Sequence, residues 1–339
     1  MKLFNNAISA MVVGVIFLII VPLPTWLLDF MFITNLSLSF VILLTTMYIR
    51  RALDFSIYPS ILLITTLFRL ALNISSTRSI LSNQGYAGEV VKTFGEFVIR
   101  GDVVVGLVIF LIIVLVQFLV ITKGSERVAE VSARFTLDAM PGKQMAIDAD
   151  LSSGLIDEQT ARQRRSDIQR EADFFGSMDG ASKFVKGDAI MSLVTTFINL
   201  VGGIIVGFMD HVGTFGEIMQ VYSTATVGDG LMSQVPALLI SVATGMIVTR
   251  SASENNLNED VIHQFTSQPM VLIMTSLAMV CLCFIGFPVP QVLTLAAMLM
   301  GLGVVLLRSQ RKAAIVAAEG PAIKEEVTSE ADFYKNIDN

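Results

Sequence analysis

The chain has 339 residues, of which 53% are hydrophobic and 15% charged, and its mean hydropathy is +0.70. Soluble domains carry about 45–50% apolar and about 25% charged residues, so this composition argues against a soluble globular protein. The net charge of -6 leaves no excess of Lys and Arg to neutralise phosphates, which makes nucleic acid a poor candidate partner.

About eight apolar stretches are candidates for crossing a bilayer, which takes about 20 residues for a helix. We therefore expect an all-α integral membrane protein with about eight transmembrane helices. The predicted spans are residues 7–21, 30–49, 57–75, 103–121, 188–209, 231–249, 269–287 and 289–307. The first is followed by Val21-Pro22-Leu23-Pro24 and by no signal-peptidase site, so we expect it to be retained. Short connections predict that the first two and the last two spans form antiparallel hairpins.

A polar stripe in the third span contains Arg69. Asn73 and Thr77 follow it at steps of four, and Thr66 precedes it by three, so all four residues share one helical face. An Arg in a span costs about 2.5–3.5 kcal/mol on insertion scales, so the stripe must face protein or water. Two interpretations stay open for Arg69, a structural tie between helices and a place in an ion path.

Between the fourth and fifth spans lies a polar insert, residues 123–187. The segment from Lys123 to Lys186 holds 10 Lys and Arg and 11 Asp and Glu, and residues 158–175 have helical spacing. We expect a small cytoplasmic subdomain held partly by its neighbours, because so few residues bury little core. The predicted domains are therefore transmembrane segments 1–122 and 188–308, the insert, and a cytoplasmic linker, 309–339, to a C-terminal domain missing from this chain.

The fifth span repeats the pattern with an acid at its head. Asp188, Ser192, Thr195 and Asn199 fall on one helical face, which could form a relay for protons or cations. The alternative is that Asp188 caps the helix N-terminus, since it follows Lys183 and Lys186 at the predicted membrane edge. Ahead of the sixth span, Gly228-Asp229-Gly230 is typical of a turn, which we place on the outer side.

The distribution of basic residues predicts the orientation. With a cytoplasmic N-terminus, 19 Lys and Arg face the cytoplasm, and only Arg69, Arg78, Lys92 and Arg100 remain for the membrane interior or the outer side. Both termini are therefore expected in the cytoplasm. The chain lacks the common nucleotide-binding, zinc-protease and serine-hydrolase motifs, so we expect no enzyme activity, no cofactor and no metal site.

Two segments carry a family resemblance, residues 69–78 (RLALNISSTR) and residues 138–151 (DAMPGKQMAIDADL). Both are similar to signatures of the FHIPEP family, the large export-gate subunit of type III secretion systems, and the resemblance extends from residue 7 to about residue 308. Residues 251–257 (SASENNL) look more like the flagellar branch than the virulence branch.

The resemblance implies an eight-helix membrane half, a cytoplasmic loop and a homononameric ring in the bacterial inner membrane. Expected partners are further copies of the chain, the other membrane subunits of the gate and the lipid bilayer. Exported proteins and their chaperones would bind through the missing C-terminal domain. The implied function is to couple a proton, or possibly sodium, motive force to protein export. A passive ring scaffold and a small-solute transporter are the alternatives, and the absence of an internal repeat disfavours the second.

The resemblance and the polar stripes together define the candidate residues. The predicted ion path, with Asp188 as the preferred proton site, comprises Asp188, Lys183, Arg69, Asn73, Arg78, Ser192 and Asn199. The predicted loop and interface residues are Arg127, Arg134, Asp138, Pro141, Gly142, Lys143, Asp229 and Arg250.

Overall fold

Helices are the only regular elements in residues 7–211, 213–250, 257–282 and 288–311, which the computed structural model describes. The predicted all-α class is therefore confirmed. The chain divides into two units, residues 1–256 and residues 257–339, and each is described by itself.

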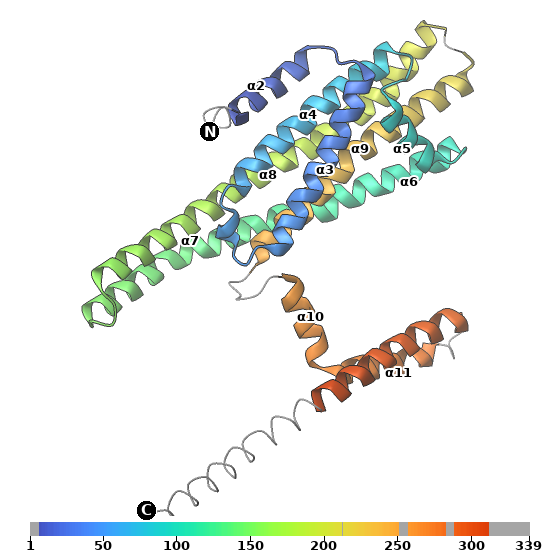
Figure 1. Ribbon diagram of the computed structural model, residues 1–339. Helices are drawn as coiled ribbons and strands as arrows, with labels where there is room; N and C mark the ends of the chain where they lie inside the picture. The colour runs from blue at the N-terminus through green and yellow to red at the C-terminus, as the bar shows by residue number, and fades with distance from the viewer. Residues whose placement is uncertain (1–6, 212, 251–256, 283–287, 312–339) are drawn as a thin grey trace, which may run out of the picture. The chain divides into compact units, whose positions relative to one another are not determined.

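The first unit is built around α9, which contacts α3, α4, α5, α6, α7 and α8 (Figure 1). Tyr222, Met232 and Ile240 of α9 are fully buried among these helices. The elements are α2 (Ala7–Ile20), α3 (Thr25–Tyr48), η1 (Ala52–Phe55), α4 (Tyr58–Ser82), α5 (Glu89–Ile99), α6 (Val103–Val116), η2 (Gln117–Thr122), α7 (Lys123–Ser152), α8 (Glu158–Met209) and α9 (Phe215–Thr249).

Local chemistry explains why even strand-forming sequences are helical here. α6 consists almost wholly of Val, Ile and Leu, and in lipid such a segment must satisfy its backbone groups internally, which a helix does. Asp102 caps it by accepting hydrogen bonds from the backbone of Val104 and Val105 at 3.0 and 3.1 Å. α2 packs on α4, and Arg78 and Ser75 of α4 donate to carbonyls at its C-terminal end.

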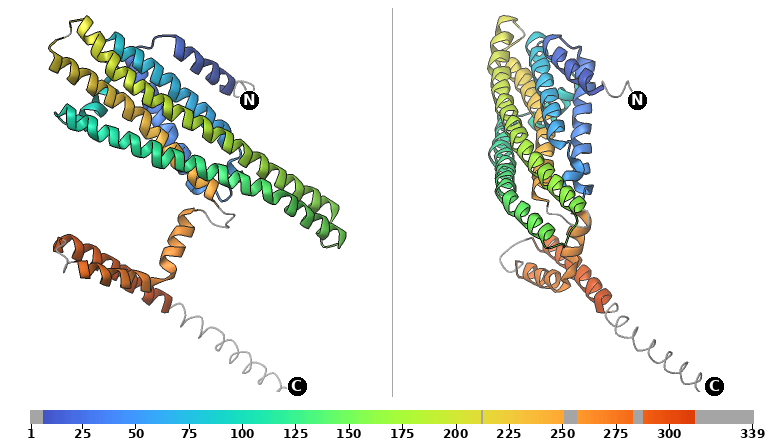
Figure 2. Two further views of the ribbon diagram at one scale, coloured as in Figure 1. Left: turned by 180° about the vertical axis from the view of Figure 1, so that it is seen from behind. Right: turned by 90° about the vertical axis from the view of Figure 1, so that its left-hand side faces the viewer.

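The polar insert forms an antiparallel helical hairpin of α7 and the first part of α8, which projects beyond the other helices of this unit (Figure 2). Ala129, Ala133 and Ile147 are buried along α7. Four ion pairs join the arms, Lys143–Glu171, Arg164–Asp150, Arg165–Asp148 and Lys186–Glu126, at 2.5–3.2 Å.

The expected boundary between residues 187 and 188 falls inside α8, which runs without a break from the hairpin to Met209. The helix begins at Glu158, where Asp157 accepts a 2.9 Å hydrogen bond from the backbone of Thr160. Hydrogen bonds from the side chain and backbone of Thr160 lower the pKa of the Asp157 carboxyl. The change from polar to apolar residues along α8 suggested a domain boundary, but the helix continues through this change.

In the described part of the chain, six helices are long and apolar enough to cross a membrane, or seven if a bent pair counts as one span. The predicted count of about eight is therefore not confirmed. Within the described residues α2 has 14 residues, fewer than the about 20 that a span takes. An 11-residue helix that was not predicted, α5, lies between the third and fourth spans.

The second unit contains α10 (Leu257–Ser267), α11 (Pro269–Leu282) and a last helix, Val289–Arg311. A 71° bend separates α10 from α11. The last helix lies antiparallel to α11, as predicted, because Ser276 contacts Met300 and Gln310 donates to the carbonyls of Thr266 and Ser267. Residues 286 and 287, in the short connection between these two spans, lie outside the described residues.

Candidate functional site

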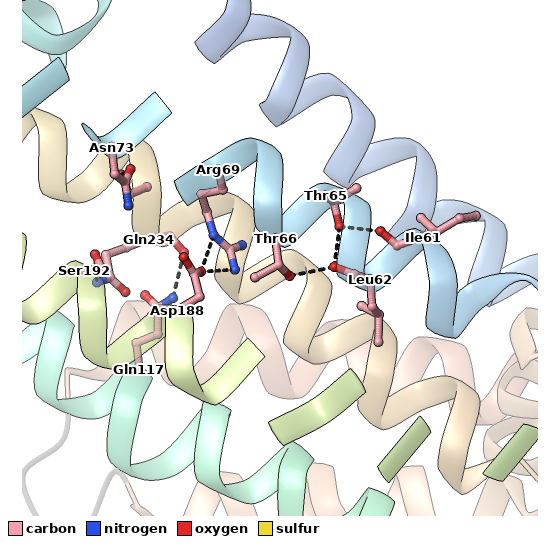
Figure 3. A network of polar contacts seen from close by, with 11 residues as sticks. Ile61, Leu62, Thr65, Thr66, Arg69, Asn73, Gln117, Asp188, Ser192 and Gln234 are labelled. Carbon is pink, nitrogen blue, oxygen red and sulfur yellow. Dashed lines mark hydrogen bonds and ion pairs between the residues drawn. The ribbon is translucent and has the colours of Figure 1, made fainter. Parts of the chain in front are cut away.

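An ion pair between Arg69 of α4 and Asp188 of α8 lies at the centre of the first unit (Figure 3). The Arg69 Nε atom donates to Asp188 Oδ2 at 2.6 Å, and the Nη2 atom contacts the same oxygen. Both side chains are 2% exposed. The two polar stripes predicted from separate spans therefore face each other, and each charge satisfies the other inside the membrane part.

Asp188 stands in the interior of α8, 30 residues after its first residue, Glu158, so the capping interpretation is wrong. Its Oδ1 atom has no hydrogen-bond partner among the described residues, and neither has Arg69 Nη1. A buried ion pair with unused donors and acceptors is costly to maintain, because its mutual attraction must offset the desolvation of both ions. The pair thus retains hydrogen-bonding capacity for water or an ion.

A second buried carboxyl, that of Asp229 in α9, lies further along the same helices. Asn199 Nδ2 donates to Asp229 Oδ2 at 2.9 Å, and Ser76 Oγ donates to Asp229 Oδ1. No Lys or Arg pairs with this carboxyl among the described residues. Asp229 therefore belongs with the predicted ion-path residues and not with the loop and interface residues.

The predicted turn at Gly228-Asp229-Gly230 is wrong, since all three residues lie inside α9. The two glycines serve close packing instead. A Cβ on Gly228 would lie 1.9 Å from the Val91 carbonyl oxygen, and one on Gly230 would lie 2.4 Å from the Phe110 ring. The residues that favour a turn in a soluble protein here let α5 and α6 approach α9.

Buried hydroxyl and amide side chains lie next to both carboxyls. Ser233 Oγ donates to Asn73 Oδ1 and, at 3.0 Å, to the Asp229 carbonyl. Ser192 lies one helical turn after Asp188 and accepts a hydrogen bond from Gln234 Nε2 at 3.2 Å. Asn73, Ser192 and Asn199 are thus buried beside Asp188 and Asp229, as the stripes indicated. We call this group of buried polar residues the seam.

Sequence reasoning missed Ser76, Gln117 and Gln234 in this seam. Gln117 donates to the Gln234 carbonyl at 2.7 Å, and both side chains are about 5% exposed. A signal existed for Gln117, since it is the only amide in an apolar run of 19 residues, 103–121. Ser76 lies seven residues after Arg69 and so shares its face.

Two predicted ion-path residues lie apart from the seam. The Lys183 side chain is 58% exposed and pairs with Asp179 at 2.7 Å on the outside of α8. Arg78 points toward α2, where its guanidinium donates to the carbonyls of Ile19 and Ile20 at 3.0 and 2.9 Å. Lys183 therefore pairs within α8, whereas Arg78 joins α4 to α2.

The predicted loop residues lie on a helix. Pro141 and Gly142 are inside α7, which continues through them without a break, and Asp138 is exposed on it. Arg127 and Arg134 flank Glu130 at 2.7 and 3.7 Å, and Lys143 pairs with Glu171 across the hairpin. Arg250 donates to the Arg50 carbonyl at 3.0 Å and so joins the end of α9 to the end of α3.

The chemistry available in the seam is exchange of protons or binding of a small cation. Carboxyls, hydroxyls and amides line it, and ionisable groups inside a membrane part commonly mark ion paths. Within the described residues, no group of three or more His, Cys, Asp and Glu side chains could hold a metal ion.

The chain is about 50% identical to several known bacterial proteins. The flagellar biosynthesis protein FlhA of Bacillus subtilis is 54% identical over 283 residues, which cover 84% of this chain and 42% of the relative. The harpin secretion protein HrpI of Erwinia amylovora is 50% identical over 301 residues, with coverages of 87% and 42%. The low calcium response locus protein D of Yersinia pestis is 49% identical over 308 residues, with coverages of 90% and 44%.

The chain spans less than half the length of these relatives. No solved structure matches it. The FHIPEP family model matches residues 15–338, which is nearly the whole sequence. Together with the apolar helices and the two segments identified above, this match shows that the chain is a multi-pass membrane protein belonging to the FHIPEP family.

Proposed function

We propose that the chain is the membrane part of a type III protein export gate and that it couples a proton, or possibly sodium, motive force to export. The observation that carries the proposal is the Arg69–Asp188 pair, a pair of opposite charges buried between membrane-crossing helices. The printed names of the relatives, a flagellar biosynthesis protein and a harpin secretion protein, support a role in secretion.

Energy coupling needs a titratable or ion-binding group inside the membrane. One charge that crosses 100 mV releases about 2.3 kcal/mol, and a carboxyl reached by water can use it. Protonation of Asp188, or binding of a cation to it, would remove its attraction for Arg69. That change would shift α8 and with it one arm of the hairpin, because the same helix contains both Asp188 and this arm.

The hairpin is the element through which such a change would reach other proteins. Its arms are charged and exposed, and its four inter-arm ion pairs keep α7 and α8 together. We infer that it faces the cytoplasm, with both chain termini, in a bacterial inner membrane. The predicted basic-residue distribution supports this orientation.

Further copies of the chain in a homononameric ring, the other membrane subunits of the gate and the lipid are the proposed partners. Exported proteins and their chaperones would bind a C-terminal domain outside this chain. The proposal includes no enzymatic reaction and no cofactor, since the ion is transported. A passive ring scaffold is the rival function, in which the same polar seam only holds the helices together.

Export from cells separates the two functions. The Asp188→Asn variant of the full-length protein, as the cell's only copy, should assemble in the membrane at normal levels and lose export. Asp173→Asn is the matched control, because Asp173 is exposed on the same helix and hydrogen-bonds only to Gln169. Normal export by the Asp188→Asn protein would overturn ion coupling at this site.

A further inference from the structure

Gln117 begins η2, a π-helical segment that joins α6 to α7. No other π-helical segment occurs in the described ranges. A π-helix has wider turns than an α-helix, is rare, and is found frequently at functional sites. Here it lies where the apolar α6 passes into the hairpin arm α7, and its first and last residues, Gln117 and Thr122, are buried.

The Gln117 side chain fixes η2 to the opposite helix. It donates to the backbone carbonyl of Gln234 in α9 at 2.7 Å, and the Gln234 side chain donates in turn to Ser192 Oγ at 3.2 Å (Figure 3). Pro236 lies two residues further along α9. Because Pro236 has no N–H, the carbonyl four residues before it lacks its helical donor, which weakens the backbone ladder at this level.

The bridge Gln117–Gln234–Ser192 ends one helical turn from Asp188. The two arms of the hairpin thus connect to the ion pair by different routes. α8 contains Asp188 itself and is a regular helix from its arm through that residue, whereas α7 is joined to α8 by ion pairs such as Lys186–Glu126 and, through η2, by the bridge. A shift of α8 against α6 must therefore be taken up in η2 if the inter-arm ion pairs are to stay intact.

We propose that the Gln117–Gln234–Ser192 bridge transmits the charge state of the Arg69–Asp188 pair to α7, which makes Gln117 a positioning residue for coupling. The inference rests on the proposed function and adds the path by which the ion site moves the hairpin. It goes beyond packing because the bridge joins a side chain of the π-helical segment to the helix that carries Asp188.

Spin-label distances in the full-length protein test the bridge. Labels at Tyr48→Cys and Met145→Cys, both on exposed positions of α3 and α7, report on α7 in a background with Cys281→Ser and Cys283→Ser. Neutralisation by Asp188→Asn should shift this distance. The shift should be lost when Gln117→Leu is added, and also when the milder Ser192→Ala is added. Gln220→Leu, on the exposed side of α9, should leave the shift intact.

Ion flux by the same proteins in liposomes distinguishes a failure of the bridge from a failure of the proposed ion coupling. Gln220→Leu, at an exposed position outside the seam, should leave both the Asp188-dependent flux and the α7 shift in place. If Asp188→Asn shifts the label equally with and without the bridge, or causes no shift at all, the bridge is overturned. If Asp188→Asn also leaves flux unchanged, the proposed function fails with it.

Discussion

Removing Arg69 while keeping Asp188 tests the ion pair as an energetic unit. Arg69→Met preserves much of the side-chain volume but leaves a carboxylate that is 2% exposed without its cation. Breaking a buried pair in this way costs about 3–5 kcal/mol, because the remaining charge is uncompensated. The double variant Arg69→Met with Asp188→Asn removes both charges, and most of that loss should be regained.

Thermal unfolding of the purified protein in detergent measures both changes. For domains of 150–250 residues, 1 kcal/mol shifts the Tm by about 2–4 °C, so Arg69→Met should lower the Tm by about 6–20 °C. The double variant should unfold nearer the wild-type Tm yet still lack export. A fall of less than about 2 °C for Arg69→Met would refute the reasoning, since an exposed pair contributes about 0–1 kcal/mol. A double variant that is less stable than both single variants would refute it as well.

Three further predictions concern helix contacts around the site. Gly228→Ala places a Cβ 1.9 Å from the Val91 carbonyl and should destabilise α5 on α9 by about 1–3 kcal/mol in unfolding assays, whereas Gly245→Ala, with no atom within 4 Å, should be neutral or slightly stabilising. Arg78→Met removes the donors to Ile19 and Ile20 and should speed amide exchange in α2 alone; unchanged exchange there would contradict the assigned contact. Because the pKa of Asp157 is lowered by Thr160, its capping contribution is present above the pKa of an unfolded Asp, about 3.9, and is lost as the pH falls through the lower folded value. Asp157→Ala should therefore fray the first turn of α8 at pH 7, and the difference from wild type in amide exchange should vanish once the carboxyl is protonated in both states.

The polar stripes were predictable because a membrane helix leaves few choices for a charge. Arg69 and Asp188 each lay on a polar face of an apolar span, and each had to meet protein or water. Nothing in either periodicity indicated that the two faces meet. That contact depends on how α4 and α8 pack, which helical spacing alone does not determine.

Two errors come from applying rules for soluble proteins inside a membrane part. Glycine and aspartate favour turns in water, but at residues 228–230 they provide close packing and a buried carboxyl. Gln117 was passed over as a single polar residue in an apolar run, although its burial makes an unsatisfied amide expensive and a partner necessary.

Ion flux into liposomes tests the central claim most directly. The full-length protein, its Asp188→Asn variant and the Asp173→Asn control would be compared under an imposed pH gradient and then a sodium gradient. The account predicts flux of one ion in wild type and control that the Asp188→Asn substitution abolishes. No flux in any of them would contradict the account and favour the passive scaffold, and equal flux in all three would contradict ion coupling at Asp188.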